Sequence, residues 1–223
     1  GSEFVELKNI IFIAVFLTSI TFFAFSIRKL LRYLLLGKPE LRWDHPLKRT
    51  VQMIKVAFAQ LKLFREPIPG LMHAFIFWGF LVLLTAILEA ILEGIIPHFT
   101  AAQILGSAYP LIAFFQEFFA LLVIVGVGIA LYRRIILKPK RLDRSRHAQI
   151  DAIAILCTIF LIMVTMLGQY AAHSALNGPA EGRFMSNELQ KLFFPLSDST
   201  VVWYEVCWWF HILLVLGFLN YLP

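Results

Sequence analysis

Cysteine is scarce in this sequence of 223 residues. The two cysteines, Cys157 and Cys207, both lie inside long apolar stretches and form no C-x-x-C pair, so we expect buried thiols and no structural disulfide. The chain also lacks a C-x-x-C-H motif for covalent haem and a four-cysteine run for an iron–sulfur cluster. Any iron–sulfur chemistry must therefore come from a partner protein or domain.

Charged residues are also few, at 15% of the chain, whereas a soluble domain carries roughly a quarter. Hydrophobic residues make up 60% and fall into blocks that each exceed the ~20 residues needed to cross a bilayer as a helix. The sequence predicts an all-α integral membrane protein, a single domain over residues 1–223 that forms a five-transmembrane-helix bundle. The predicted spans are Ile10–Leu36, Leu71–Ile96, Ala108–Leu137, Gln149–Ala172 and Val201–Leu222.

Lysine and arginine are missing from the second loop, Pro97–Gly106, and sparse in the fourth, His173–Thr200. They crowd the first and third loops, which predicts that these two loops face the cytoplasm. The N-terminus is then outside and the C-terminus in the cytoplasm. The first block is too long for a signal-peptide core and lacks a cleavage site, so we expect a retained helix. The net charge of +6 reflects this topology and does not indicate nucleic-acid binding.

The first loop contains an amphipathic pattern over about residues 46–65. Its apolar residues recur every three or four positions, with basic residues on the other faces. We expect a helix on the inner membrane surface; a solvated basic helix is the alternative. Pro67 and Pro69 break this helix, and Gly70 lets the chain enter the membrane at Leu71. The apolar residues are Leu47, Val51, Ile54, Phe58, Leu61 and Phe64.

Two of the six histidines, His73 and His211, lie within apolar blocks. An imidazole in the membrane needs a polar partner or a metal, and neutral imidazole is a common axial ligand of haem iron. Aromatic and small residues surround both histidines and suit a flat macrocycle. The sequence thus predicts haem b, with His73 and His211 as axial ligands; a hydrogen bond to a neighbouring helix is the alternative for each.

The depths of the two histidines argue for separate sites. At 1.5 Å per residue, His73 lies within roughly 5 Å of the inner boundary and His211 roughly 12–16 Å below the outer one. They differ by about 10–15 Å in depth, whereas trans ligands of one iron lie only about 4 Å apart. We therefore expect an inner haem at His73 and an outer haem at His211.

Polar side chains also occur near the outer ends of the apolar blocks. Such residues could line a proton path to a quinone, or they could be ordinary interfacial polarity. They are Glu89, Glu93, Gln116, Glu117, Gln169, Tyr170 and Glu205.

Most of the chain resembles the gamma subunit of respiratory nitrate reductase, a five-helix di-haem cytochrome b. Four segments, 37–40, 65–67, 73–80 and 217–223, further resemble the membrane part of heterodisulfide-reductase-related proteins, which include electron-transfer-flavoprotein:menaquinone oxidoreductases. The resemblance implies a partner for His73 beyond Pro223. It also implies a partner for His211 ten residues after His73, where this chain has Leu83. Met163, Met166, His173 or no second ligand are the alternatives there.

Together these observations predict a membrane subunit or domain of a bacterial inner-membrane oxidoreductase. It would contain one or two haems b and relay electrons between a cytoplasmic iron–sulfur or flavin partner and menaquinone. The partner could be an electron-transfer flavoprotein, and the basic inner loops are where it would dock. One alternative is a haem-poor structural anchor of a redox complex. Another is a small transporter, which the scarcity of charges in the middle of the spans disfavours.

Overall fold

The computed structural model describes residues 2–38, 40, 43–58, 66–138 and 145–223. Every regular element in these ranges is helical, and five helical segments are long and apolar enough to cross a membrane. The prediction of five long apolar helices is confirmed in the described residues. The long helices are α1 (Ser2–Leu35), α3 (Pro67–Ile95), α5 (Tyr109–Tyr132) with η4 (Arg133–Leu137), α6 (Arg146–Asn177) and α8 (Asp198–Tyr221).

Most helix boundaries differ from the predicted spans, for example the start of α1 at Ser2 instead of Ile10, and two of these differences have a clear local cause. The second helix, α3, begins at Pro67 and not at Leu71, because proline lacks an amide hydrogen and fits the first turn of a helix. The fourth helix continues to Asn177, beyond the expected end at Ala172, and Gly178 with φ of 94° follows it. The glycine adopts a positive φ without steric cost and turns the chain out of the helix.

The structure contains the first part of the amphipathic helix that was predicted for the first loop. Helix α2 (Pro46–Met53) continues into the π-helix η1 (Ile54–Phe58). Residues 59–65, where the prediction placed the last part of this helix, lie outside the described residues. The described side chains of α2 are exposed, as expected for a helix on a surface of the protein.

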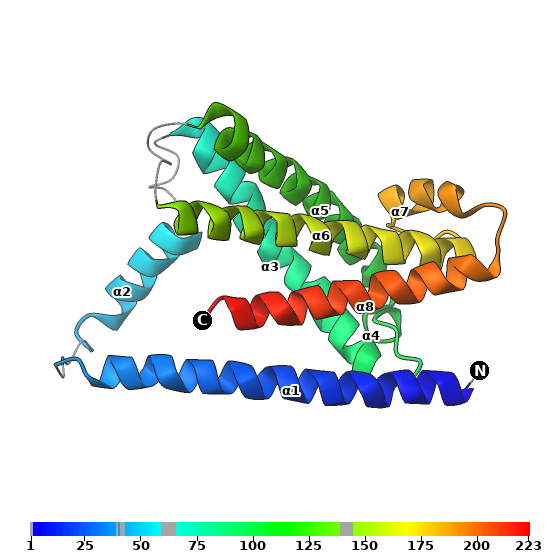
Figure 1. Cartoon of the computed structure of the whole chain (residues 1–223), viewed down its shortest axis with the longest axis horizontal. Helices are drawn as coiled ribbons and strands as arrows, with labels where there is room; N and C mark the ends of the chain where they lie inside the picture. The colour runs from blue at the N-terminus through cyan, green and yellow to red at the C-terminus, as the bar shows by residue number, and fades with distance from the viewer. Residues whose placement is uncertain (1, 39, 41–42, 59–65, 139–144) are drawn as a thin grey trace.

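The long helices pair into a bundle with two distinct ends (Figure 1). Helix α6 packs chiefly on α8 and α3 chiefly on α5, while α1 contacts both α8 and the last turns of α3. Helix α2 lies near the C-terminus, at what we call the α2 end. The N-terminus lies at the opposite end with the short helices α4 (Ala102–Leu105) and α7 (Phe184–Leu189), which we call the α7 end.

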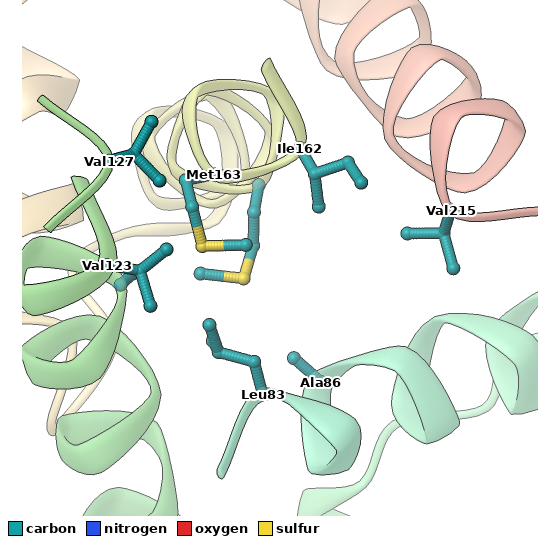
Figure 2. Packing of buried hydrophobic residues seen from close by; sticks show 9 residues of the cluster. Leu83, Ala86, Val123, Val127, Ile162, Met163 and Val215 are labelled. Carbon is teal, nitrogen blue, oxygen red and sulfur yellow. The ribbon is translucent and has the colours of Figure 1, made fainter. Parts of the chain in front are cut away.

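Apolar side chains from α3, α5, α6 and α8 meet in the centre of the bundle. Figure 2 shows Met163 of α6 facing Leu83 of α3 and Val123 of α5, with Val215 of α8 across from Ile162. A second group joins α1 to α3 and α8 around Phe12 and Trp208, both fully buried. Met163 is therefore part of the packed centre of the bundle, where it meets side chains from three other helices.

The two cysteines are free thiols. Cys207 is half-buried beside Gly168, but Cys157 is exposed, so the prediction that both are buried is wrong for Cys157. The reason is that an apolar span does not bury all of its faces within the protein. In a membrane, an exposed apolar face meets lipid instead of water.

Candidate functional site

His211 lies in the middle of α8 and is 2% exposed. Its Nδ1 lies 3.0 Å from the backbone carbonyl oxygen of Ile162 on α6. Because a carbonyl oxygen only accepts hydrogen bonds, Nδ1 carries the proton and the neutral ring keeps a lone pair on Nε2. Nε2 is buried and has no hydrogen-bond partner. A histidine that binds a metal typically has this arrangement, with one nitrogen donating to a carbonyl and the other open.

An apolar cavity of about 480 Å³ lies next to His211. Side chains from α1, α3, α5, α6 and α8 line it, and nearly all of its wall is apolar. The wall includes Phe16 and Ile20 of α1, Phe77 and Phe80 of α3, and Phe218 of α8. A volume of a few hundred Å³ with few polar groups is typical of a cofactor or ligand site.

His73 lines the same cavity as His211. It lies near the start of α3, close to the α2 end, and its ring stacks on Phe77 with 6.4 Å between ring centroids. The structure therefore brings the two predicted ligands to one continuous apolar space. His73 belongs to the first turns of α3 and His211 to the middle of α8.

The candidates for a second ligand near His211 fall into two groups. Met163 and Met166, which are 5% and 1% exposed, line the cavity together with Leu83. His173 does not line it; this residue lies further toward the α7 end, where its ring is 5.9 Å from that of Tyr204. Met163 and Met166 therefore remain candidates for the second ligand. The site also fits a haem group, because the Nε2 lone pair of His211 has no partner and lies at an apolar cavity with two thioether side chains in its wall.

A separate polar cluster lies at the α7 end, centred on Arg183. This side chain is 3% exposed, although it belongs to the segment between α6 and α7. Its Nη2 donates to the Tyr109 hydroxyl at 2.9 Å, and that hydroxyl donates to Glu89 Oε1 at 2.8 Å. The Arg183 Cζ lies 3.6 Å from the centroid of the Tyr170 ring, a cation–π contact. Helices α3, α5 and α6 thus all contribute to this cluster.

Charge balance holds Arg183 in this buried position. Burial by itself lowers the pKa of Arg183, but Tyr170, Tyr109 and Glu89 outweigh that effect and raise the pKa above its ordinary value. Nη2 also lies 3.9 Å from Glu89 Oε2, so a buried cation and a buried carboxylate are paired. A buried charge without such a partner is strongly destabilising.

A neighbouring group of charged residues links α1, α3 and α8. Lys8 forms an ion pair with Glu205 at 2.9 Å and lies 4.1 Å from the centroid of the Trp208 ring. The indole nitrogen of Trp208 donates to Glu93 at 3.4 Å. Of the glutamates predicted at the outer ends of the spans, Glu89 therefore belongs to the Arg183 cluster, and Glu93 and Glu205 belong to this neighbouring group.

Glu117 has a structural role next to the Arg183 cluster. The side chain is completely buried on α5 and accepts hydrogen bonds from the backbone amides of Met185 and Ser186, at 2.7 and 3.3 Å, and from the Ser186 hydroxyl. A carboxylate is favoured at the N-terminus of a helix, here α7. Glu117 thus fixes α7 to the bundle and is fully occupied by that task.

The other buried oxygens without a hydrogen-bond partner in the described residues include two glutamine side-chain oxygens. These are Oε1 of Gln116 and Oε1 of Gln169, in side chains that are 1% and 3% exposed. Gln116 uses its amide nitrogen to donate to Thr85 at 3.1 Å. Buried polar groups are rarely left unpaired in native proteins, so each of these oxygens indicates a place where a further donor would be accommodated.

Sequence reasoning did not identify Arg183 or Tyr109 as site residues. Arg183 was one of a few charges in an external loop, and Tyr109 lies at the edge of an apolar block. One signal was present: Arg183 follows Gly178 and Gly182, two glycines that adopt positive φ and fold the segment back onto the bundle. A Cβ at Gly182 would lie 2.1 Å from the Pro110 carbonyl oxygen, which shows how closely this segment approaches α5.

The fold and the cavity define a helical protein with several candidate membrane spans and an internal apolar site. Two curated bacterial proteins are similar to it. One is a probable iron-sulfur-binding oxidoreductase, FadF, of Bacillus subtilis, 29% identical over all of this chain. The other is an EtfAB:quinone oxidoreductase of Syntrophomonas wolfei, 27% identical over 94% of it. The chain spans only 31% and 30% of the length of these relatives. No family model and no solved structure matches.

Proposed function

We propose that this chain relays electrons through haem b, between a cytoplasmic iron–sulfur or flavin partner and menaquinone. The observation that carries the proposal is the buried His211 imidazole, whose Nδ1 is held by the Ile162 carbonyl and whose Nε2 has no partner next to an apolar cavity. The relatives support a redox role, since both are named as oxidoreductases.

The chain's own residues would hold and shield the haem. His211 Nε2 would bind one iron, and the Ile162 carbonyl fixes the orientation of that ring. His73, toward the α2 end of the cavity, would bind the iron of an inner haem. The apolar wall excludes water and provides a low-dielectric surrounding. When bound, haem supplies reversible one-electron transfer.

The partner proposal rests on two observations. One relative is named as iron-sulfur-binding and the other as acting on EtfAB and quinone, and this chain encodes no four-cysteine cluster motif. The basic first and third loops would lie on the cytoplasmic side of a bacterial inner membrane and receive an acidic surface of the partner. Electrons would move between that partner and menaquinone by way of the groups that His73 and His211 would hold.

A reduced-minus-oxidised absorbance spectrum of the purified protein tests this function directly. We expect the alpha band of haem b, and the protein should lose it in part when His73 or His211 is replaced by alanine. A protein purified from haem-replete cells that shows no such band would contradict the proposal. That result would leave the second role that the sequence allows, a structural anchor for a redox complex.

A further inference from the structure

The Arg183 guanidinium has one amino group that the protein does not use. Nη2 is occupied by Tyr109 and Glu89, whereas Nη1 is buried and has no hydrogen-bond partner. The side chain is 97% buried, so bulk water is not available to it. A buried donor without an acceptor is destabilising, and an acceptor atom from a ligand would relieve this.

The charge of the cluster selects the kind of acceptor. Glu89 already pairs with Arg183, and the two charges cancel. An anion would therefore gain little from the guanidinium and would be repelled by Glu89, which is only 7% exposed. A neutral carbonyl oxygen satisfies Nη1 without adding charge to a buried site.

Aromatic rings surround the same position. Tyr170 lies against the guanidinium, and Phe184, the residue after Arg183, packs on Phe114 with 5.3 Å between ring centroids. Phe114 on the candidate span α5 and Phe184 on α7 are 42% and 39% exposed. An apolar ring that approaches Arg183 along this exposed pair would meet aromatic side chains.

We propose that Arg183 is the hydrogen-bond donor to a carbonyl oxygen of a quinone headgroup at the α7 end of the bundle. A quinone combines the two features that the site calls for, a neutral carbonyl acceptor and a flat apolar ring. This inference rests on the proposed function, because it names where the quinone of that electron relay binds. Tyr109 and Glu89 continue from the other amino group of Arg183, Nη2, in a hydrogen-bonded chain.

Menadione binding to the purified full chain in detergent tests this assignment. Arg183→Lys keeps the charge that Glu89 requires but replaces the planar fork with one ammonium group, which cannot serve Tyr109 and a carbonyl in the same geometry. We expect the Kd for menadione to rise about tenfold or more. Methylnaphthalene, which has the ring but no carbonyl, should bind equally to both proteins.

Glu117→Gln is the matched control. It weakens the attachment of α7, the helix that follows Arg183, without touching the guanidinium. We expect it to weaken menadione binding less than Arg183→Lys does, and not to leave it untouched, because α7 also carries Phe184. Equal weakening by Glu117→Gln and Arg183→Lys would show that only the packing of the segment matters, and it would overturn the assignment.

The infrared carbonyl stretch of isotope-labelled menadione gives a second measurement. If Arg183 had a purely structural role, its replacement would not change the frequency of this band. Binding should shift this band, and Arg183→Lys should remove the shift. A shift that persists in Arg183→Lys but disappears in His211→Ala would place the ring in the central cavity and refute the assignment. Haem absorbance of the same samples reports separately on the proposed relay, because menadione binding requires no haem.

Discussion

His211 Nδ1 and the Ile162 carbonyl oxygen lie 3.0 Å apart and join the middle of α8 to the middle of α6. This bond fixes the tautomer of a fully buried imidazole and leaves its second nitrogen without a protein partner. Helices α6 and α8 form one of the two extensively packed pairs of the bundle, so the ring orientation is determined by rigid elements. A site on packed helices is held more accurately than one on loops.

Replacement of His211 by alanine should remove one haem per chain. The substitution deletes the only nitrogen in the described part of the cavity wall besides His73 that could bind iron. Haem content should be measured by the pyridine haemochrome method, with His98→Ala as control, because His98 is exposed and lies at a positive φ between α3 and α4. Unchanged haem content in His211→Ala would contradict a haem at this position.

Replacement of Leu83 by histidine should convert the outer haem to a low-spin, six-coordinate form. Leu83 is 4% exposed and lines the same cavity as His211, so an imidazole at this position faces the same space. Electron paramagnetic resonance should show a gain of low-spin signal. Leu88→His provides the control, since Leu88 is on the same helix but 60% exposed and should change nothing. An identical spectrum for Leu83→His and its parent would argue against iron near His211.

The long helices could be predicted from the sequence because the thickness of the bilayer requires each span to be a long and continuously apolar segment. The sequence singled out His73 and His211 because an imidazole is conspicuous within an apolar span, and it assigned them to two separate sites. It did not show that both face a single cavity. Depth follows from the rise per residue, but the rotation of each helix about its axis depends on packing with neighbours.

The Arg183 cluster could not be found from sequence because its members come from distant segments. Arg183 and Tyr109 are 74 residues apart, and Tyr109 and Glu89 are 20 apart. Only the folding back of the segment around Gly182 brings them together. In contrast, Glu89 and Tyr170 were visible as polar residues near the ends of spans, and Glu89 is 7% exposed in the structure.

Replacement of Gly94 by alanine should destabilise the contact between α1 and α3. A Cβ at Gly94 would lie 2.3 Å from the fully buried Phe12 ring, whereas carbon atoms prefer about 3.5–4.0 Å. The free energy of unfolding in detergent should fall by about 1–3 kcal/mol. Gly217→Ala is the control, because nothing lies within 4 Å of its added Cβ. Equal stability of the two variants would mean that Phe12 does not pack on Gly94.

Replacement of Glu117 by glutamine should loosen α7 without unfolding the bundle. The amide keeps one acceptor oxygen, so it cannot accept all of the bonds that Met185 and Ser186 now donate. Hydrogen exchange of these two backbone amides should accelerate by about tenfold or more, since a hydrogen bond to a charged group contributes about 1.5–3 kcal/mol. Amides in the middle of α6 serve as the internal control and should keep their exchange rates.

The α2 end should face the cytoplasm and the α7 end the outside. The three lysine and arginine residues at the α7 end are each ion-paired, Lys8 with Glu205, Arg183 with Glu89 and Lys191 with Glu188, so they add no net positive charge there. Described basic residues of the first and third loops belong to segments at the other end, Lys48 and Arg49 to α2 and Arg133 and Arg134 to η4, and such residues retain their loops in the cytoplasm.

Reporter fusions test this orientation. A fluorescent protein that folds only in the cytoplasm should be bright when it is fused after Pro223, and alkaline phosphatase should be active when it is inserted after Pro179, in the turn that follows α6. The turn after α6 and the end of α8 lie at opposite ends of the bundle, so each orientation gives one clear pattern of signals (Figure 1). Joint replacement of Arg28, Lys29 and Arg32 by glutamine should reduce both signals, because it removes a cluster of charges at the inner end of α1. The reciprocal pattern, with phosphatase active after Pro223, would reverse the orientation and place the basic loops outside.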